Sequence, residues 1–188
     1  MPPFAEAGTP GDLPAGPNHG ATTRLLHWGA AALLVAAFTL GLAMDAWPRG
    51  APRDTAAMVH YSLGVLVFGL ALVRLLRRLL LPRPKAEGSL PVRLAAGAMH
   101  RALYAAMIAV PVTGAFDRWA RGRPLTVFGD TVIPAPFAVG GGRAWKEAHE
   151  LIAYALVALV AAHAAAALWH HLVLKDHTLR RMLPFARG

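Results

Sequence analysis

Nine histidines occur in this chain of 188 residues, and most of them lie in or beside apolar segments. Imidazole nitrogen is a ligand for transition metals and for haem iron. Two of these residues, His149 and His163, lie 14 residues apart in the last apolar segment. Fourteen residues are close to four turns of an α-helix, so both side chains would lie on one face, roughly 21 Å apart along the axis. One helix could therefore provide a ligand to each of two sites.

The same 14-residue interval follows three other histidines, and each time it ends on glycine or arginine. The pairs are His60 with Arg74, His27 with Gly41, and His100 with Gly114. An arginine inside an apolar segment needs a partner, and a haem propionate or a quinone headgroup would provide one for Arg74. Glycine has no side chain, so Gly41 and Gly114 could let a porphyrin lie against their helices.

The elements that must position these histidines are four apolar segments, at about residues 25–44, 55–81, 94–116 and 148–174. Each is near or above the roughly 20 residues that a helix needs to cross a hydrocarbon core. A soluble bundle of buried helices would need polar faces at helical period, and these segments have almost none. We therefore expect an all-α membrane protein, a four-helix transmembrane up-down bundle.

The rest of the composition sets the domain boundaries and limits the chemistry. We expect the bundle to cover residues 22–184, with a disordered tail at 1–21 and a short tail at 185–188. The chain has no cysteine, which excludes disulfides, iron–sulfur clusters and covalent haem attachment. Its net charge of +9 is typical of Lys and Arg that flank membrane spans, since no soluble basic domain remains to bind nucleic acid.

Basic residues are unevenly divided between the two sides of the predicted bundle. Twelve Lys and Arg lie on the side of the termini and seven on the opposite side. This division predicts a multi-pass protein of the bacterial inner membrane with both termini cytoplasmic. In this orientation His60 and His149 form an outer layer, and His27, His100 and His163 form an inner one. Two imidazoles that face each other across a bundle make a bis-histidine site for haem iron, and from the layers alone either His27 or His100 could partner His163.

Four stretches carry a family resemblance that covers roughly residues 22–184. They are RLLHWGAAALLVAAFTLGL, VHYSLGVLVFGLALVRLLRR, MHRALYAAMIAVPVTG and AHELIAYALVALVAAHAAAALWHHLVLKDHTLRRMLP. Their ordered motifs are H-W, H-x-S-x-G, L-Y-x(6)-P-x-T-G, and H-E followed by H-A-A-A-A-L-x-H-H and K-D. In these motifs the chain resembles the bacterial cytochrome b561 family, whose members are membrane b-type dihaem electron carriers.

The resemblance implies two non-covalent haem b groups. One would be held by His60 and His149 and the other by His27 and His163, so that His100 becomes a packing residue near the second haem. A haem with two axial histidines is coordinatively saturated and suits one-electron transfer. The resemblance further implies an oxidoreductase that oxidises periplasmic superoxide and reduces ubiquinone.

Two alternatives to this function remain open from the sequence. The chain could be the cytochrome b subunit of a larger complex, passing electrons between a periplasmic dehydrogenase, or another donor, and the quinone pool. It could also be a haem or metal transporter, which would release its ligand, whereas an electron carrier keeps its haem tightly bound.

Candidate residues for electron entry lie before and at the start of the last span. The third connection is basic and contains Arg118, Arg121 and Arg123, and Lys146 lies one turn before His149. Superoxide is a small anion, so a basic surface would steer it toward the outer site. Lys146 is the residue we expect nearest to that site, while the alternative for the three arginines is a solvated loop surface.

Candidate residues for electron exit lie at the other end of the same span. His170 and His171 are followed closely by Lys175 and Asp176. His170 lies seven residues after His163, almost on the same helical face. It could donate a hydrogen bond or a proton to a reduced quinone, and the alternative for the pair is an interfacial anchor of the helix end.

Overall fold

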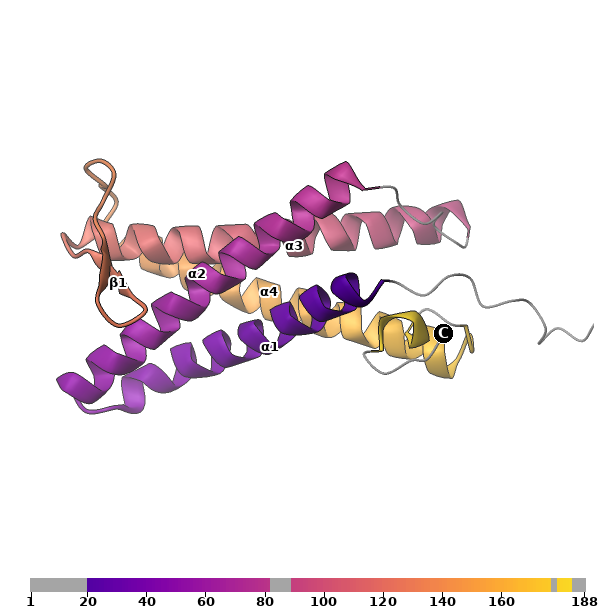
Figure 1. Cartoon of the computed structure of the whole chain (residues 1–188), viewed down its shortest axis with the longest axis horizontal. Coiled ribbons are helices and arrows are strands. Elements are labelled where there is room, and N and C mark those ends of the chain that lie inside the picture. Colours follow the sequence, from indigo (N-terminus) through magenta and orange to yellow (C-terminus); the bar gives the residue numbers. More distant parts are fainter. Residues whose placement is uncertain (1–19, 82–88, 177–178, 184–188) are drawn as a thin grey trace, which may run out of the picture.

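Four long helices make up most of the structure, a computed structural model that describes residues 20–81, 89–176 and 179–183 (Figure 1). The helices are α1 (Ala21–Ala43), α2 (Ala51–Leu80), α3 (Leu90–Ala120) and α4 (Arg143–Leu172). An antiparallel hairpin of β1 (Leu125–Val127) and β2 (Thr131–Ile133) follows α3, and short 3-10 helices lie at Met44–Ala46 and Arg180–Met182. Nearly all of the tail predicted at 1–21 and all of that at 185–188 lie outside the described residues, as do His19 and His177.

All four helices are long and apolar enough to cross a membrane, so the predicted all-α transmembrane bundle is confirmed. Consecutive helices run in opposite directions (Figure 1). Each helix begins a few residues before the predicted span. With 31 residues, α3 is about 46 Å long, which exceeds a hydrocarbon core of about 30 Å. The ends of the longer helices therefore extend beyond the hydrocarbon.

Small side chains let the helices approach each other closely. The core consists of Ala30, Val67, Ala71, Ala106, Met107 and Leu156, each at most 8% exposed. Many larger apolar side chains point outward, among them Leu25, Leu79 and Leu151. Because lipid is as apolar as a protein interior, close packing of small residues holds such a bundle together more than the burial of large ones does.

The two ends of the bundle differ in architecture. We call the end with the β-hairpin and the starts of α2 and α4 the hairpin end, and the end with the start of α1 and the end of α4 the terminal end (Figure 1). At the hairpin end, the backbone N–H of Phe128 donates to Ser62 Oγ (2.8 Å) and that of Gly129 donates to Met58 Sδ (3.4 Å). These bonds attach the hairpin, which the apolar pattern did not predict, to α2 two residues before and two residues after His60.

At the terminal end, the last described residues fold back onto α1. The Trp28 indole N–H donates to the carbonyl of Met182 (2.7 Å), and Arg24 donates to the carbonyl of Leu183 (3.2 Å). The segment that follows α4 therefore lies against the first two turns of α1. It lies beside His27, whose ring centroid is 5.6 Å from that of Trp28.

Candidate functional site

Two histidines face each other at the hairpin end. His60 of α2 and His149 of α4 have ring centroids 6.2 Å apart, and their planes are nearly perpendicular, at 86°. Nδ1 of His60 donates to the carbonyl of Ala37 (3.0 Å), and Nδ1 of His149 donates to the carbonyl of Val110 (2.9 Å). A carbonyl can only accept, so each ring carries its proton on Nδ1 and keeps the lone pair of Nε2 available to a metal ion.

Glycines on α1 and α3 make these hydrogen bonds possible. Ala37 lies four residues before Gly41, and Val110 lies four residues before Gly114. A helical side chain covers the turn that precedes it, so a glycine leaves the carbonyl of that turn open to a second donor. A Cβ atom would lie 3.1 Å from the facing imidazole at Gly41 and 3.0 Å from it at Gly114. The sequence pattern had suggested that a porphyrin occupies the space beside both glycines. In the structure, the imidazole rings themselves fill that space.

Three histidines gather at the terminal end. The ring centroid of His163 lies 6.2 Å from that of His27 and 5.5 Å from that of His100. His100 donates from Nδ1 to the carbonyl of Ala96 (2.7 Å), one turn earlier on its own helix. Arg74 Nη2 donates to Nδ1 of His27 (3.3 Å). The structure therefore brings both possible partners of His163 together and places Arg74 beside one of them.

Two guanidinium groups accompany this cluster. Arg74 and Arg78, one turn apart on α2, lie over the ring of Tyr104, with their Cζ atoms 5.7 and 5.8 Å from its centroid. Cation–π attraction helps to hold these two like charges near each other. Charged groups inside a membrane bundle require counter-charges, so this end is suited to an anionic group such as the carboxylates of a cofactor.

The donor set fits haem rather than a bare metal ion. A metal–imidazole bond is about 2 Å long, so two imidazoles on opposite sides of one ion have ring centroids about 6 Å apart. Two pairs have this spacing, at 6.2 Å each. Across the part of the chain that the structure describes, no group of three or more His, Cys, Asp or Glu side chains could hold a metal ion. A haem iron needs only two axial protein ligands, because the porphyrin supplies the others.

Comparison with known proteins shows similarity to one family of cytochromes. The sequence model of the prokaryotic cytochrome b561 family matches residues 18–185. The chain belongs to this family. Cytochrome b561 homolog 2 of Escherichia coli (strain K12) is 35% identical over 179 residues, which cover 88% of this chain and 91% of that protein. Probable superoxide oxidase CybB of Yersinia pestis is 30% identical over 168 residues, covering 87% and 94%. Cytochrome b562 of Cereibacter sphaeroides is 31% identical over 164 residues, covering 84% and 90%.

Membership in the cytochrome b561 family confirms the resemblance seen in the motifs. The chain is a membrane-embedded b-type cytochrome, and its cofactor is haem b. It is an oxidoreductase that functions in electron transfer.

The predicted entry residue of this cytochrome, Lys146, lines a cavity at the hairpin end. The cavity has a volume of about 450 Å³ and is also lined by Arg121, Gly142 and Arg143. Lys146 pairs with Glu150 at 3.3 Å. Of the other basic residues predicted to steer an anion, Arg118 lines a different cavity, and Arg123 lines neither.

The predicted exit residues of the cytochrome lie where α4 ends. His170 Nδ1 is 2.5 Å from Asp176 Oδ2, and the backbone N–H of Asp176 donates to the carbonyl of His170 (3.1 Å). Lys175 has a φ of 54°, a left-handed conformation that turns the chain and brings Asp176 back to the helix end. His171 is half-buried and makes no comparable contact with a described side chain.

A second cavity of the cytochrome, also at the hairpin end, was missed from the sequence. It lies between α2, the end of α3 and the hairpin, with Asp54, Met58 and Tyr61 on the α2 side. These three residues recur at helical spacing, which could have indicated that they share one face of the first turns of α2. Its opposite wall comes from Arg118 and the hairpin, and no local pattern places those residues there.

Replacing Gly114 with alanine should displace His149 in the cytochrome. The added Cβ atom would lie 3.0 Å from the imidazole, so we expect a cost of about 1–3 kcal/mol from overpacking and less haem per chain. Gly69→Ala is the matched control, because a Cβ atom there meets nothing within 4 Å. Pyridine haemochrome absorbance measures the haem content of both variants. Equal haem content in the two would contradict this role of Gly114.

Proposed function

We propose that this cytochrome binds two haem b groups, oxidises superoxide at the hairpin end and reduces ubiquinone at the terminal end. The observation that carries the proposal is one pair of facing histidines at each end. His60 with His149 and His27 with His163 both have ring centroids 6.2 Å apart. His149 and His163 are 14 residues apart on α4, which is roughly 21 Å along the axis. One helix thus supplies one ligand at each level.

The protein's part in this scheme is to hold each imidazole in the tautomer that binds iron through Nε2. Each bound haem would supply a reversible one-electron couple. At the hairpin end, the Nδ1 hydrogen bonds to α1 and α3 fix the tautomer. At the terminal end, binding through Nε2 of His27 requires the proton on Nδ1, which Arg74 now approaches as a donor. Arg74 would then leave His27 for a haem propionate, the role expected of it from the sequence.

His27 is favoured over His100 as the partner of His163. The separation of His27 and His163 equals that of the hairpin-end pair, whereas the ring centroids of His100 and His163 are 5.5 Å apart. His100 also directs Nδ1 to the preceding turn of its own helix, so it forms no bond between helices. We assign it a packing role against the ring of His163.

The cavity around Lys146 supports superoxide as the electron donor. Its charged lining consists of Arg121, Arg143 and Lys146, and Lys146 lies one turn before His149. Each of these cations pairs with a carboxylate four residues away. Exposed pairs of this kind contribute little energy, so the basic side chains can turn toward an arriving anion. A relative that is 30% identical is named a probable superoxide oxidase.

The contact between His170 and Asp176 supports quinone reduction at the terminal end. Ubiquinone takes up two protons when it becomes ubiquinol, so a proton donor must lie nearby. Asp176 accepts from Nδ1 of His170, so the protonated form of this imidazole would direct its Nε2 proton to a quinone oxygen. His171, the next residue, is the second candidate on this side.

The distribution of basic residues supports a periplasmic hairpin end and cytoplasmic termini. Twelve of the 19 Lys and Arg residues lie in segments on the side of the termini, as the positive-inside rule expects of the cytoplasmic side. In this orientation superoxide reacts in the periplasm, and ubiquinone is reduced at the inner leaflet of the bacterial inner membrane.

Haem counting combined with superoxide addition tests the proposal. The purified cytochrome should contain two haems per chain, become reduced when superoxide is added, and pass those electrons to added ubiquinone. His149→Ala should lose one haem and His163→Ala the other, while His100→Ala should keep both. Pyridine haemochrome absorbance gives the haem number, and a redox titration identifies which haem remains.

Three results would argue against parts of this scheme. Fewer than two haems in the unmodified cytochrome would contradict the two ligand pairs. If His100→Ala loses one haem and His27→Ala keeps both, then His100 is the partner of His163 and His27 is the packing residue. Two haems without any reduction by superoxide would favour a cytochrome subunit that receives electrons from a dehydrogenase.

Lys146→Gln should slow reduction by superoxide about three- to tenfold at low ionic strength. The effect should shrink as salt is added, because screening removes electrostatic steering. Arg123→Gln is the matched control, since it removes a positive charge from the same connection without touching the cavity. Stopped-flow absorbance at several salt concentrations measures both variants, and a loss independent of salt would show that Lys146 does not act by steering.

Asp176→Asn should slow reoxidation of the cytochrome by ubiquinone about tenfold or more, because His170 loses the carboxylate that orients it. Reduction by superoxide at the other end should not change in the same variant. Asp176→Glu keeps the carboxylate and should recover part of the rate. Stopped-flow absorbance separates the two half-reactions. Equal loss in both half-reactions would contradict a role for Asp176 at the quinone side.

A further inference from the structure

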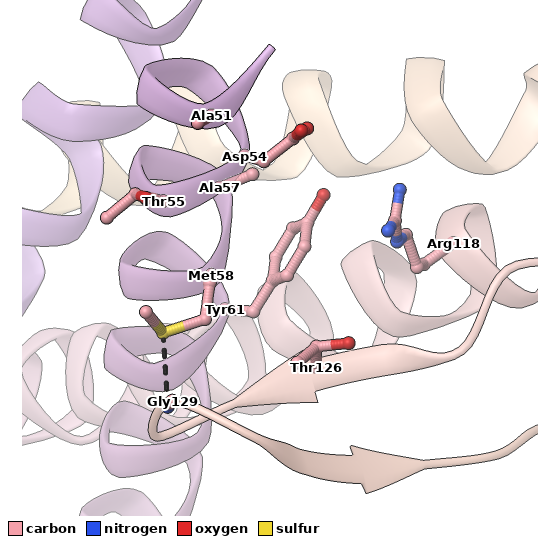
Figure 2. A pocket seen from close by; sticks show the side chains of 9 residues that line it. All are labelled: Ala51, Asp54, Thr55, Ala57, Met58, Tyr61, Arg118, Thr126 and Gly129. Atoms are coloured by element: carbon pink, nitrogen blue, oxygen red, sulfur yellow. Dashed lines mark hydrogen bonds between the residues drawn. The ribbon is translucent and has the colours of Figure 1, made fainter.

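The cavity between α2, the end of α3 and the hairpin has a volume of about 470 Å³. This volume is within the range of sites that bind small organic molecules. Its walls include Asp54, Met58 and Tyr61 from α2, Arg118 from the end of α3 and Thr126 from the hairpin (Figure 2). None of these residues lines the cation-rich cavity around Lys146. The hairpin end therefore has two separate openings with different chemistry.

Three polar groups converge in this cavity. The Tyr61 hydroxyl points to the space between the Asp54 carboxylate and the Arg118 guanidinium (Figure 2). Within the described part of the chain, neither Asp54 nor Arg118 forms an ion pair, and the Tyr61 hydroxyl makes no hydrogen bond. Arg118 is held in place by its Nε bond to the carbonyl of Pro124 (3.2 Å) and by its position 5.4 Å from the Tyr61 ring centroid. A carboxylate that can accept a proton thus faces a fixed cation.

The remaining wall is suited to a flat apolar surface. The Met58 thioether and the Tyr61 ring lie along one side (Figure 2), and both make favourable contacts with aromatic rings. The bond from the Gly129 N–H to Met58 Sδ (3.4 Å) keeps the hairpin against this wall. An aromatic molecule with oxygen atoms at opposite edges would place one hydroxyl at Asp54 and the other oxygen at Arg118.

The cavity adjoins the histidine pair of the hairpin end. Tyr61 follows His60 in the sequence, and their ring centroids are 6.1 Å apart. The Tyr61 ring therefore lines the cavity and also contacts the ring of His60. The 30 residues of α2 extend about 45 Å, more than a hydrocarbon core of about 30 Å. The first turns of α2, which line the cavity, can therefore lie outside the hydrocarbon and meet water-soluble molecules.

We propose that this cavity is a second electron-donor site, which binds dihydroxybenzene reductants; the inference rests on the proposed haem ligation by His60. In the first step the O–H bond of the donor breaks, the proton passes to the Asp54 carboxylate and then to water, and one electron enters the cytochrome. A neutral aryloxyl radical leaves. Two such radicals disproportionate to one quinone and one dihydroxybenzene. Arg118 stabilises the donor oxygen as its proton is lost.

Superoxide does not need this set of groups. It loses an electron without releasing a proton, and the Asp54 carboxylate would repel it. The cavity around Lys146, whose charged lining residues are all cationic, suits superoxide better. We therefore assign the cavity around Lys146 to an anionic donor that carries no proton. The cavity beside Tyr61 is assigned to an organic donor that must release one.

The test uses the haem-loaded cytochrome and trimethylhydroquinone under anaerobic conditions. The initial rate of cytochrome reduction should saturate with donor concentration. Asp54→Asn and Arg118→Gln should each lower the low-concentration slope about tenfold and abolish saturation. Asp130→Asn and Arg123→Gln make the same chemical changes at exposed positions that do not line the cavity, and they should retain the unmodified behaviour.

A binding measurement separates recognition from electron transfer. 4-Hydroxybenzaldehyde has a hydroxyl and a carbonyl oxygen at opposite edges of its ring but cannot be oxidised to a simple quinone, so it should bind in calorimetry and inhibit trimethylhydroquinone competitively. Both effects should be lost in Asp54→Asn and Arg118→Gln. A linear donor dependence that neither substitution changes would overturn the proposal. Loss of superoxide-driven reduction in both variants would also overturn it, because their effect would then lie on the shared histidine pair. Saturable, Asp54-dependent reduction by trimethylhydroquinone without any reduction by superoxide would uphold this site and refute superoxide as the donor.

Discussion

The hydrogen bonds from Nδ1 of His60 and His149 to backbone carbonyls are the interactions on which the hairpin end depends. They join α2 to α1 through Ala37 and α4 to α3 through Val110. In lipid, an imidazole N–H that lacks a protein acceptor has no water to replace it, so these bonds fix the orientation of both rings. Each bond also needs a helix carbonyl with room for a second donor. A glycine four residues after each of these carbonyls provides that room. Each histidine therefore depends on a glycine of the neighbouring helix.

The terminal end is less tightly determined by such bonds. There, Arg74 donates to Nδ1 of His27 from its side chain, and Nδ1 of His100 donates to a carbonyl of its own helix. Two arginines and an aromatic ring surround the histidines. This arrangement has more freedom to adjust when an anionic cofactor binds. The carboxylates of a haem would pair with the guanidinium groups. At the other end, backbone carbonyls accept the hydrogen bonds of the imidazoles.

The spacing within a helix could be predicted from the sequence, whereas the contacts between helices could not. A fixed rise of about 1.5 Å per residue is enough to place His149 and His163 at two levels. The same rise places Gly41 toward the other end of its helix from His27, and Gly114 toward the other end of its helix from His100. Which ring lies near His163 depends on how α1 and α3 cross α4, and apolar periodicity does not encode a crossing.

The hairpin shows the same limit of sequence reasoning. Its strands have three residues each, too few for an alternating pattern to stand out. Its position depends on two N–H groups that find acceptors on α2, at Ser62 and Met58. The cavity beside Tyr61 then follows from that position, because its walls come from three separate elements. The motifs of the b561 family predict candidate haem ligands, but only the assembled chain reveals the residues that surround them.

The two ends of the bundle differ in the groups that surround their histidines. Arg74 and Arg78 lie among the terminal-end histidines, and positive charge in a region of low dielectric stabilises an added electron. At the hairpin end, both imidazoles donate to carbonyls, which would make them more basic ligands of a haem iron. In the proposed scheme the electron leaves at the terminal end, where His170 and Asp176 could supply a proton, so electron and proton would meet on the same side of the membrane.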